Sequence, residues 1–351
     1  METVKINAFG AASKEADLSK LTIARRVVQP KDVEIKILFC GVCHSDLHMA
    51  RNDWGGSVYP VVPGHEIVGV VTNVGAECTK YKIGDKVAVG CLVDSCRTCS
   101  SCKEDLEQYC DLGLVGGTYN GHDKYLNQQT FGGYSEKIVV DEHFVLKLPD
   151  NLDLAAVAPI LCAGITTWSP LRRWNVKAGS KVAVVGLGGL GHMAIKLAKG
   201  LGADVTLFSR STSKIQDAKD LGCDAVVIST DEAQMNAVAN KFDVIIDTVP
   251  YVHDLNPYIA TLHHSGTLVL VGYLGPLENI LNTAPMVMGR KAISGSLIGG
   301  IAETQELLDF CGEKNIVSEI EIIKMQDINN AYERMLKSDV KYRFVIDMST
   351  L

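Results

Sequence analysis

The sequence lacks a hydrophobic run long enough to cross a membrane. Its most apolar stretch, residues 182–195, contains His192 and ends at Lys196, well short of the roughly 20 apolar residues that a membrane helix requires. The first residues, METVKINAFGAASKE, lack a basic region followed by an apolar run, so we expect no secretory signal. These absences predict a protein of the cytoplasm with no membrane partner.

An excess of positive charge is also missing. Lys and Arg number 34 against 41 Asp and Glu, which gives a formal net charge of −7. That charge repels phosphate backbones unless basic residues are segregated into a patch, and the sequence has no such patch. We therefore expect no nucleic-acid partner. With 47% apolar and 21% charged residues, the composition is that of an ordinary folded protein.

The length of 351 residues predicts about two domains. Residues 1–154 have short apolar segments between turns, which predicts a mostly β domain with strands at 33–37, 67–71, 86–89 and 137–146. From 155 to 293 strand and helix patterns alternate, which predicts a parallel sheet with strands at 181–186, 204–208, 225–228, 242–247 and 267–272. Residues 294–351 are too few to bury a core well. We expect them to return to the first domain, with the α/β unit inserted.

Cysteine is abundant, with 11 residues. In a chain without a secretory signal this number indicates metal binding in a reducing compartment. Cys96, Cys99, Cys102 and Cys110 have the spacing C-x2-C-x2-C-x7-C, which places four thiolates on one loop short enough to wrap a tetrahedral ion. Four sulfur ligands with no open position favour structural zinc. The alternatives are an iron–sulfur cluster, a pair of disulfides or an accidental cysteine-rich loop.

A second group of metal-binding residue types is dispersed over three segments, GVCHSDLH, PGHEIVG and LCAG. Cys43, His65 and Cys162 could supply two sulfurs and a nitrogen and leave a fourth position for water or substrate, the arrangement of a catalytic zinc. Glu66 could be a fourth ligand. Spacing over about 120 residues does not show that the segments meet, because a lone His or Cys is more often packed or solvated.

A glycine-rich motif, GLGGLG, follows the apolar strand KVAVV and precedes an apolar-periodic helix. In that context G-x-G-x-x-G predicts a dinucleotide site, because its glycines permit a tight turn and the helix N-terminus faces the pyrophosphate. A plain strand–turn–helix is the alternative. The motif residues are Gly186, Leu187, Gly188, Gly189, Leu190 and Gly191.

The loop after the next strand indicates which cofactor is used. NAD sites usually place Asp or Glu about 20 residues beyond the glycine motif, where this chain has Ser209. The loop instead offers hydroxyls and two cations to a 2′-phosphate, which favours NADP. Its residues are Ser209, Arg210, Ser211, Thr212, Ser213 and Lys214. They could equally cap the following helix, since Ser and Thr are good N-caps.

These elements, in this order, resemble the zinc-dependent medium-chain dehydrogenase/reductase superfamily and its cinnamyl alcohol dehydrogenase branch. The resemblance covers essentially the whole chain and includes GVCHSD, PGHE, the four-cysteine loop, GGYSEKIVV, LCAGITTWSPL, GLGGLGHMAIK, SRSTSK and YRFVID. It implies a GroES-like catalytic domain, 1–154, an inserted Rossmann NADP-binding domain, 155–293, and a return to the catalytic domain, 294–351. It further implies two zinc ions per subunit, one catalytic and one structural, and we expect a homodimer.

The resemblance also implies roles for single residues. It makes Cys43, His65, Glu66 and Cys162 the catalytic zinc site, with Ser45 and then His48 as a relay that carries a proton to solvent. Alternatively, Ser45 caps a helix that begins near Asp46 and His48 is merely exposed on it. Trp54 would lie near the mouth of the substrate pocket or else pack in the core. Further positions correspond to residues that hold the cofactor in that family: Thr166, Thr248, Gly272, Ser296, Leu297, Ile298 and Arg343.

Two pocket positions depart from the lignin-pathway members of that branch, which carry Trp and Phe where this chain has Gly117 and Leu297. Because both changes remove aromatic surface, we expect a wider pocket and broader specificity. The sequence thus predicts an NADP-dependent zinc alcohol dehydrogenase, or aldehyde reductase, for aromatic (cinnamyl- or benzyl-type) or medium-chain primary aldehydes. The alternatives are a polyol or secondary-alcohol dehydrogenase of the same superfamily and a non-catalytic protein that binds NADPH and zinc.

Overall fold

The computed structural model describes residues 2–273 and 275–351 and divides the chain into two compact units. Unit 1 consists of Met1–Cys162 and Gly299–Leu351, and unit 2 consists of Ala163–Ile298. Among the described residues no single helix is long and apolar enough to span a membrane, although one bent pair, Leu154–Leu161 with Ala163–Arg173, passes by length and composition.

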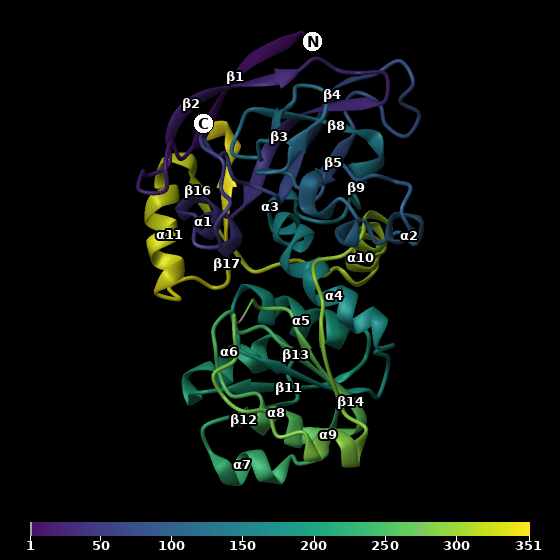
Figure 1. Cartoon of the computed structure of the whole chain (residues 1–351), viewed down its shortest axis with the longest axis vertical. Helices are drawn as coiled ribbons and strands as arrows, with labels where there is room; N and C mark the ends of the chain where they lie inside the picture. The colour runs from purple at the N-terminus through teal and green to yellow at the C-terminus, as the bar shows by residue number, and fades with distance from the viewer. Residues whose placement is uncertain (1, 274) are drawn as a thin grey trace. The chain divides into compact units, whose positions relative to one another are not determined.

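Unit 1 is built on a seven-stranded sheet in the order β16-β17-β3-β4-β5-β9, with β8 paired to β3. Its strands are β3 (Asp32–Gly41), β4 (Ile67–Val74), β5 (Lys86–Val89), β8 (Lys137–Asp141), β9 (Leu146–Lys147), β16 (Ile320–Lys324) and β17 (Arg343–Asp347). The antiparallel pair β17–β3 brings Ile346 opposite Cys40, so the C-terminal segment completes the sheet of the N-terminal one. In Figure 1 the yellow β16, β17 and α11 accordingly lie among purple and blue elements.

The remaining elements of unit 1 are strand pairs and helices. Two further antiparallel pairs are β1 (Thr3–Gly10) with β2 (Ser19–Arg26) and β6 (His122–Asp123) with β7 (Gln128–Gln129). Its helices are α1 (His44–Arg51), α2 (Ser100–Lys103), α3 (Leu154–Val157), α10 (Ile301–Lys314) and α11 (Ile328–Leu336). Apolar side chains that alternate along the strands, such as Ile35, Ile67 and Ile138, are fully buried and form the core.

Unit 2 is a doubly wound sheet whose six strands are all parallel, in the order β12-β11-β10-β13-β14-β15. The strands are β10 (Lys181–Val185), β11 (Asp204–Ser209), β12 (Ala225–Ile228), β13 (Phe242–Asp247), β14 (Leu262–Leu270) and β15 (Ala292–Gly295). The helices are α4 (Ala163–Arg173), α5 (Gly189–Gly200), α6 (Ile215–Asp220), α7 (Glu232–Ala237), α8 (Asn256–Thr261) and α9 (Ala284–Gly289). One core cluster centres on Phe208, whose ring meets Phe242 and Tyr258 edge-on.

This architecture is the fold class that the sequence predicts, a GroES-like unit with an inserted Rossmann unit. The unit boundaries, however, lie after the predicted residues 154 and 293. Helix α3 packs on β3 and β4 of unit 1, whereas β15 pairs with β14 and so joins the sheet of unit 2. Packing against the unit 1 sheet thus sets the first boundary and pairing into the unit 2 sheet sets the second, rather than local composition.

Several elements differ from the prediction, among them β3 (Asp32–Gly41) and β4 (Ile67–Val74), which are longer than the predicted 33–37 and 67–71. The predicted strand 137–146 is interrupted because the Asp141 side chain accepts a hydrogen bond from the backbone N–H of His143, at 2.9 Å, and caps a 3-10 turn. Strand β14 covers Leu262–Leu270 rather than 267–272. The β1–β2 hairpin was not among the predicted strands at all.

Candidate functional site

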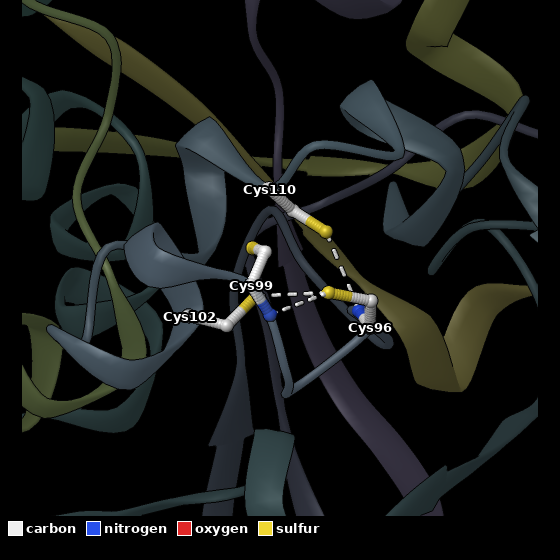
Figure 2. A group of neighbouring side chains, drawn as sticks. All are labelled: Cys96, Cys99, Cys102 and Cys110. Carbon is white, nitrogen blue, oxygen red and sulfur yellow. Dashed lines mark hydrogen bonds between the residues drawn. The ribbon is translucent and has the colours of Figure 1, made fainter.

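The four-cysteine loop brings its thiols together within unit 1, as Figure 2 shows. The sulfur atoms of Cys96, Cys99, Cys102 and Cys110 all lie within 4.8 Å of one another. Backbone N–H groups of Thr98 and Cys99 donate to the Cys96 sulfur and lower the pKa of that thiol to about 6. Burial raises the pKa of Cys102 to about 12. One loop therefore collects four sulfur donors and already stabilises one thiolate.

The spacing of these sulfurs fits a metal ion. A tetrahedral zinc with zinc–sulfur bonds of about 2.3 Å needs sulfur atoms about 3.8 Å apart. The Cys96 and Cys102 sulfurs are 3.8 Å apart, and none of the eleven cysteines forms a disulfide. The geometry thus favours the metal over the disulfide alternative.

The dispersed set also converges within unit 1. Cys43 precedes α1, His65 and Glu66 precede β4, and Cys162 follows the 3-10 helix η4 (Ala158–Leu161). One donor atom from each of the four residues lies within 4.8 Å of the others, and the Cys43 and Cys162 sulfurs are 3.9 Å apart. This separation matches the sulfur spacing of a tetrahedral zinc site. The three segments named from the sequence therefore do meet.

Asp46 holds the loops that carry these donors. It is fully buried, and its carboxylate accepts hydrogen bonds from the backbone N–H of Cys43 (2.8 Å) and Gly64 (3.0 Å) and from the Tyr134 hydroxyl (3.1 Å). The Nδ1 atom of His65 is 3.1 Å from the same carboxylate. Because Asp46 occupies Nδ1, the Nε2 atom is left for a metal, which is how carboxylates usually orient ligating histidines. Despite burial, Asp46 holds the pKa of His65 well above its usual value.

Glu66 and Arg343 form an ion pair beside the set. Glu66 is fully buried, and its Oε1 atom accepts a hydrogen bond from the Arg343 guanidinium. Its Oε2 atom has no hydrogen-bond partner among the described residues, although it is buried. Burial raises the pKa of Glu66 to about 7, against the opposing effect of Arg343. An unpartnered buried oxygen at this point fits a group that binds a cation.

The space for Glu66 depends on a glycine. A Cβ atom at Gly41, the last residue of β3, would lie 1.9 Å from the Oε2 atom of Glu66. Arg343, the first residue of β17, also donates to the Val42 carbonyl at 3.0 Å. The C-terminal strand of unit 1 thereby contributes the charge that faces Glu66, whereas the sequence assigned Arg343 to the cofactor.

The thiols of the dispersed set do not have equal pKa values. A hydrogen bond from Cys162 holds the pKa of Cys43 well below its usual value, and the same bond raises that of Cys162. Cys91, half-buried, also interacts with Cys162 and lies 3.6 Å from the Leu161 carbonyl. Cys91 therefore adds a further thiol beside the set, although no motif in the sequence pointed to it.

A second layer, residues 131–135, supports the loop before His65. The backbone N–H groups of Gly132, Gly133 and Tyr134 donate to the carbonyls of residues 62, 64 and 63 at 2.7–3.0 Å. A Cβ atom on either glycine would clash, because atoms of residues packed against it lie less than 3 Å away. The buried Arg25 of β2 donates to the carbonyl of Gly132 and to the hydroxyl of Ser135, both at 2.9 Å.

The predicted relay residues lie on α1. Ser45 donates to the Cys43 sulfur at 3.6 Å, so its hydroxyl borders the donor set. Helix α1 begins at His44 with Cys43 as N-cap, and the alternative in which Ser45 caps the helix is therefore wrong. His48 is one turn further along, on the same face. Its Nδ1 atom is 2.7 Å from the carboxylate of Asp53, a residue that the sequence analysis missed.

Trp54 does not pack in the core, since it is 48% exposed and its ring centroid lies 5.1 Å from that of His48. Gly117 forms a β-bridge with Leu92, and its carbonyl accepts a hydrogen bond from Thr130. Leu297, in unit 2, is 42% exposed. The predicted pocket positions are thus divided between the two units.

In unit 2 the glycine motif has the geometry of a phosphate-binding turn. Gly186 has a φ of +88°, which favours glycine, and a Cβ atom at Gly191 would lie 2.1 Å from the Gly186 carbonyl oxygen. Gly188 is the N-cap of α5 and has open space around the Cβ position. These are the three conditions that such a motif must meet: a tight turn, an open approach for the ligand and close helix packing.

The loop after β11 does not act as a side-chain cap. Ser211 occupies the N-cap position of the 3-10 helix η5 (Thr212–Lys214) without a capping hydrogen bond. Its hydroxyl instead lies 2.8 Å from that of Ser213. Ser209, at the end of β11, donates to the Ser211 carbonyl at 2.9 Å. No side-chain hydrogen bond therefore supports the helix-cap alternative, and the hydroxyls of Ser211 and Ser213 lie side by side.

The other predicted cofactor positions are spread along unit 2. Thr248 donates to the carbonyl of Val185, directly before the glycine turn, at 2.7 Å, and a Cβ atom at Gly272 would lie 2.4 Å from the Val249 carbonyl oxygen. Thr166 is buried in α4, and Ser296 donates its backbone N–H to Leu270. Ile298, with a φ of 34°, is the last residue of unit 2.

Comparison with known proteins gives the family. Residues 29–150 match the alcohol dehydrogenase GroES-like domain, and residues 189–313 match the zinc-binding dehydrogenase domain. The chain is 53% identical to NADP-dependent alcohol dehydrogenase C 1 of Mycolicibacterium smegmatis, with 99% of both chains covered. It is 52% identical to the aldehyde reductase YahK of Escherichia coli, again with 99% of both covered.

Among solved structures, a cinnamyl alcohol dehydrogenase of Sorghum bicolor (SbCAD4) superimposes with a TM-score of 0.94 at 45% identity, covering 99% of this chain and 98% of that one. Together with the two converging donor sets and the glycine turn, these similarities settle the family. The chain belongs to the zinc-type alcohol dehydrogenases of the medium-chain dehydrogenase/reductase superfamily, in the cinnamyl alcohol dehydrogenase branch, and is an oxidoreductase.

Proposed function

We propose that this protein is an NADP-dependent aldehyde reductase, or alcohol dehydrogenase, that holds two zinc ions and acts on aromatic or medium-chain primary aldehydes. The observation that carries the proposal is the presence in unit 1 of two separate donor sets of different kinds. The Cys96–Cys110 loop offers four sulfurs and no open position, which suits a structural ion. The Cys43 set mixes sulfur, nitrogen and oxygen, which suits a catalytic one.

In the second set Cys43, His65 and Cys162 would hold the ion. Glu66 would either occupy the fourth ligand position or leave it open. Zinc bound there supplies a Lewis acid that polarises a carbonyl oxygen. The chain's own part is to orient the ligands through Asp46 and to keep a cation, Arg343, against Glu66. Because Arg343 already pairs with one oxygen of Glu66, that carboxylate can leave the ligand position without becoming an isolated buried charge.

Reduction of an aldehyde requires a proton at the product oxygen. Ser45 would donate it, and the position of its hydroxyl beside Cys43 supports this role. His48 would return the proton to Ser45 from solvent, because its ring is partly exposed and Asp53 fixes one of its nitrogens. Ser45 and His48 would thus be the protein groups at the two ends of the relay.

Unit 2 would bind NADPH, with the pyrophosphate at the Gly186 turn and the N-terminus of α5. The Ser209–Lys214 loop offers hydroxyl groups and cations to a 2′-phosphate and no carboxylate that would repel it. The relatives named above support this, since one is called NADP-dependent.

The decisive experiment measures NADPH oxidation at 340 nm with benzaldehyde, cinnamaldehyde and hexanal, and with NADH in place of NADPH. We expect comparable kcat/KM for the three aldehydes, weak activity on ketones and polyols, and roughly hundredfold preference for NADPH. Cys162→Ala should abolish activity and remove one of two zinc ions, whereas Cys223→Ala, a buried cysteine outside both sets, should change neither. Equal use of NADH, or full activity of Cys162→Ala, would refute the proposal. Preference for a polyol would favour the polyol dehydrogenase alternative.

We also propose that the chain forms a homodimer through unit 2. Strand β15 is an edge of the six-stranded sheet, and edge strands with unpaired backbone groups can pair with a copy under two-fold symmetry. Nearby α9 exposes Val287 (81%) and Met288 (89%), and Ile280 is 93% exposed. Met288→Glu should shift the mass measured by light scattering towards the monomer, whereas Ile83→Glu, on unit 1, should not. A monomeric wild type would refute this. None of the eleven cysteines forms a disulfide, which supports a cytoplasmic location.

A further inference from the structure

Three strand ends lie side by side at one edge of the unit 2 sheet. Strand β10 is flanked by β11 and β13, and its Val185 pairs with Phe208 on one side and Asp247 on the other. Since all three strands are parallel, their carboxyl ends open at the same edge. The middle strand leads into the Gly186 turn, so the loops after β11 and β13 stand on either side of the proposed pyrophosphate site.

The two flanking loops are joined by one side-chain pair. Arg210, after β11, donates a hydrogen bond from its Nη2 atom to the Tyr251 hydroxyl at 3.0 Å, and Tyr251 follows β13. The guanidinium carbon also lies 5.6 Å from the centre of the Tyr251 ring. The pair therefore links, over the end of β10, loops that are 41 residues apart in the sequence.

The tyrosine side of this link is built on a buried anchor. The carboxylate of Asp247, fully buried at the end of β13, lies 2.9 Å from the Nε2 atom of His253. The Nδ1 atom of the same ring lies 2.9 Å from the Tyr251 carbonyl oxygen. Asp247 also accepts a hydrogen bond from the Val249 backbone. The backbone at Tyr251 is thus fixed at both ends of a short loop.

By contrast, the linking side chains themselves are in solvent. Arg210 is exposed and Tyr251 is 49% exposed. An exposed guanidinium–ring contact adds little to folding stability. Fold stability alone therefore does not explain why the Tyr251 loop is anchored by Asp247 and His253. Its effect is instead to restrict the orientation of a cation that stands in the loop proposed to bind the 2′-phosphate.

We propose that Tyr251 is a positioning residue for cofactor specificity, which holds the Arg210 guanidinium ready for the adenosine 2′-phosphate of NADP. The inference deepens the proposed function and rests on its assignment of the Ser209–Lys214 loop to that phosphate. The Tyr251 oxygen occupies one guanidinium N–H, and the ring face occupies none, so four of five donors stay available for phosphate oxygens. Ordering a flexible arginine before binding removes an entropic cost that the ligand otherwise bears.

The proposal predicts a selective loss. Without Tyr251, Arg210 must be ordered at the moment of binding, which should weaken nucleotides that carry a 2′-phosphate by roughly three- to tenfold. Nucleotides without that phosphate do not use Arg210, so their affinity should stay within about twofold. A merely structural loop residue would weaken both classes alike.

The experiment measures the dissociation constants of adenosine 2′,5′-bisphosphate and adenosine 5′-monophosphate by calorimetry on the full chain. The proteins are the wild type, Tyr251→Ala, Tyr251→Phe and Arg210→Ala. The control Trp174→Ala removes another guanidinium–ring contact of unit 2, that of Arg173, at 5.8 Å. We expect Tyr251→Ala to lower the affinity for the bisphosphate alone, Tyr251→Phe to lie between it and the wild type because the ring remains, and Trp174→Ala to have no effect.

Two results would overturn the inference alone. In one, Arg210→Ala loses the bisphosphate preference while Tyr251→Ala keeps it; in the other, Tyr251→Ala weakens both nucleotides equally. If the wild type binds both nucleotides with equal affinity, the proposed NADP preference itself is overturned, and the role of Tyr251 with it. The Tm of each variant, expected to be unchanged at the exposed positions 210 and 251, tests whether the binding differences come from unfolding.

Discussion

Replacing Asp46 with asparagine should weaken one of the two proposed zinc sites and leave the other unchanged. The carboxylate is fully buried and receives four donors, two on each oxygen: Cys43 N and the Tyr134 hydroxyl on Oδ2, and Gly64 N and His65 Nδ1 on Oδ1. Asparagine keeps the volume but has one acceptor oxygen and an amide group that donates. Whichever oxygen the amide replaces, one backbone N–H, that of Cys43 or Gly64, then faces a donor, whereas the Tyr134 hydroxyl or the neutral His65 ring on the same side can accept instead.

The magnitude follows from that count. A buried donor left without an acceptor costs about 1–3 kcal/mol, so the substitution should lower the free energy of unfolding by about that amount. Loss of the carboxylate that orients a ligating histidine typically costs about 10- to 100-fold in metal affinity. Because Asp46 touches no cysteine of the Cys96–Cys110 loop, we expect only one of the two zinc ions to bind more weakly.

The assay follows zinc release to the indicator 4-(2-pyridylazo)resorcinol under native conditions and after denaturation. In the Asp46→Asn variant one equivalent should be released about 10- to 100-fold faster than in the wild type, while the other should be unchanged. Tyr134→Phe removes one donor of the four and should show a smaller effect in the same phase. Asp53→Asn, which changes an exposed carboxylate near α1, is the control. Equal release kinetics for Asp46→Asn and wild type would refute the role given to Asp46.

Three further predictions concern stability. Arg25→Met should lower the free energy of unfolding measured in urea by about 2–4 kcal/mol, because it leaves buried acceptors unpaired; an unchanged midpoint would contradict this. Although burial opposes it, hydrogen bonds from His143 and the Ile301 N–H hold the pKa of Glu107 below its usual range. The ionised carboxylate therefore stabilises the folded state above about pH 4.3, and this stabilisation is lost as the pH falls through the lower pKa of the folded state. The free energy of unfolding of Glu107→Gln should therefore fall less steeply as the pH is lowered than that of the wild type, and an identical pH dependence would count against this role. Lys291→Met should cost about 1–3 kcal/mol and speed hydrogen exchange in α8, whose terminal carbonyls the ammonium binds; unaltered exchange would exclude this role.

The sequence was most informative where the chemistry is local. The four-cysteine loop and the glycine motif each lie within 15 residues, and their backbone conformation follows from their own spacing. The strand patterns likewise located five of the six strands of the unit 2 sheet, β15 being the exception. For such segments the residues that interact are also neighbours in the chain, so spacing carries the geometry.

The sequence was least informative about contacts between distant residues. The Tyr134 hydroxyl reaches Asp46 across 88 residues, and Arg25 reaches Gly132 across 107. No period or motif predicts such pairs from one sequence. Asp46 itself had a signal, because an acidic residue three positions after an N-cap often bonds the N-cap backbone, but the helix start was expected near Asp46 instead. Tyr251 and Asp53 lie in loops without any recognised pattern.

The two donor sets of unit 1 therefore depend on the fold in different ways. The Cys96–Cys110 loop is stabilised by its own backbone N–H groups. A substitution elsewhere in unit 1 should therefore affect this loop least. The Cys43 set takes ligands from three segments and needs Asp46, the glycine-rich support at residues 132–133 and Arg343 on the C-terminal strand to hold them together. A change that loosens any of these parts alters the second set while the first remains intact. Catalysis by a zinc ion requires a ligand position that can open. In the Cys43 set, small shifts of the groups that support the ligands could open such a position, whereas the Cys96–Cys110 set could open one only if its loop unfolded.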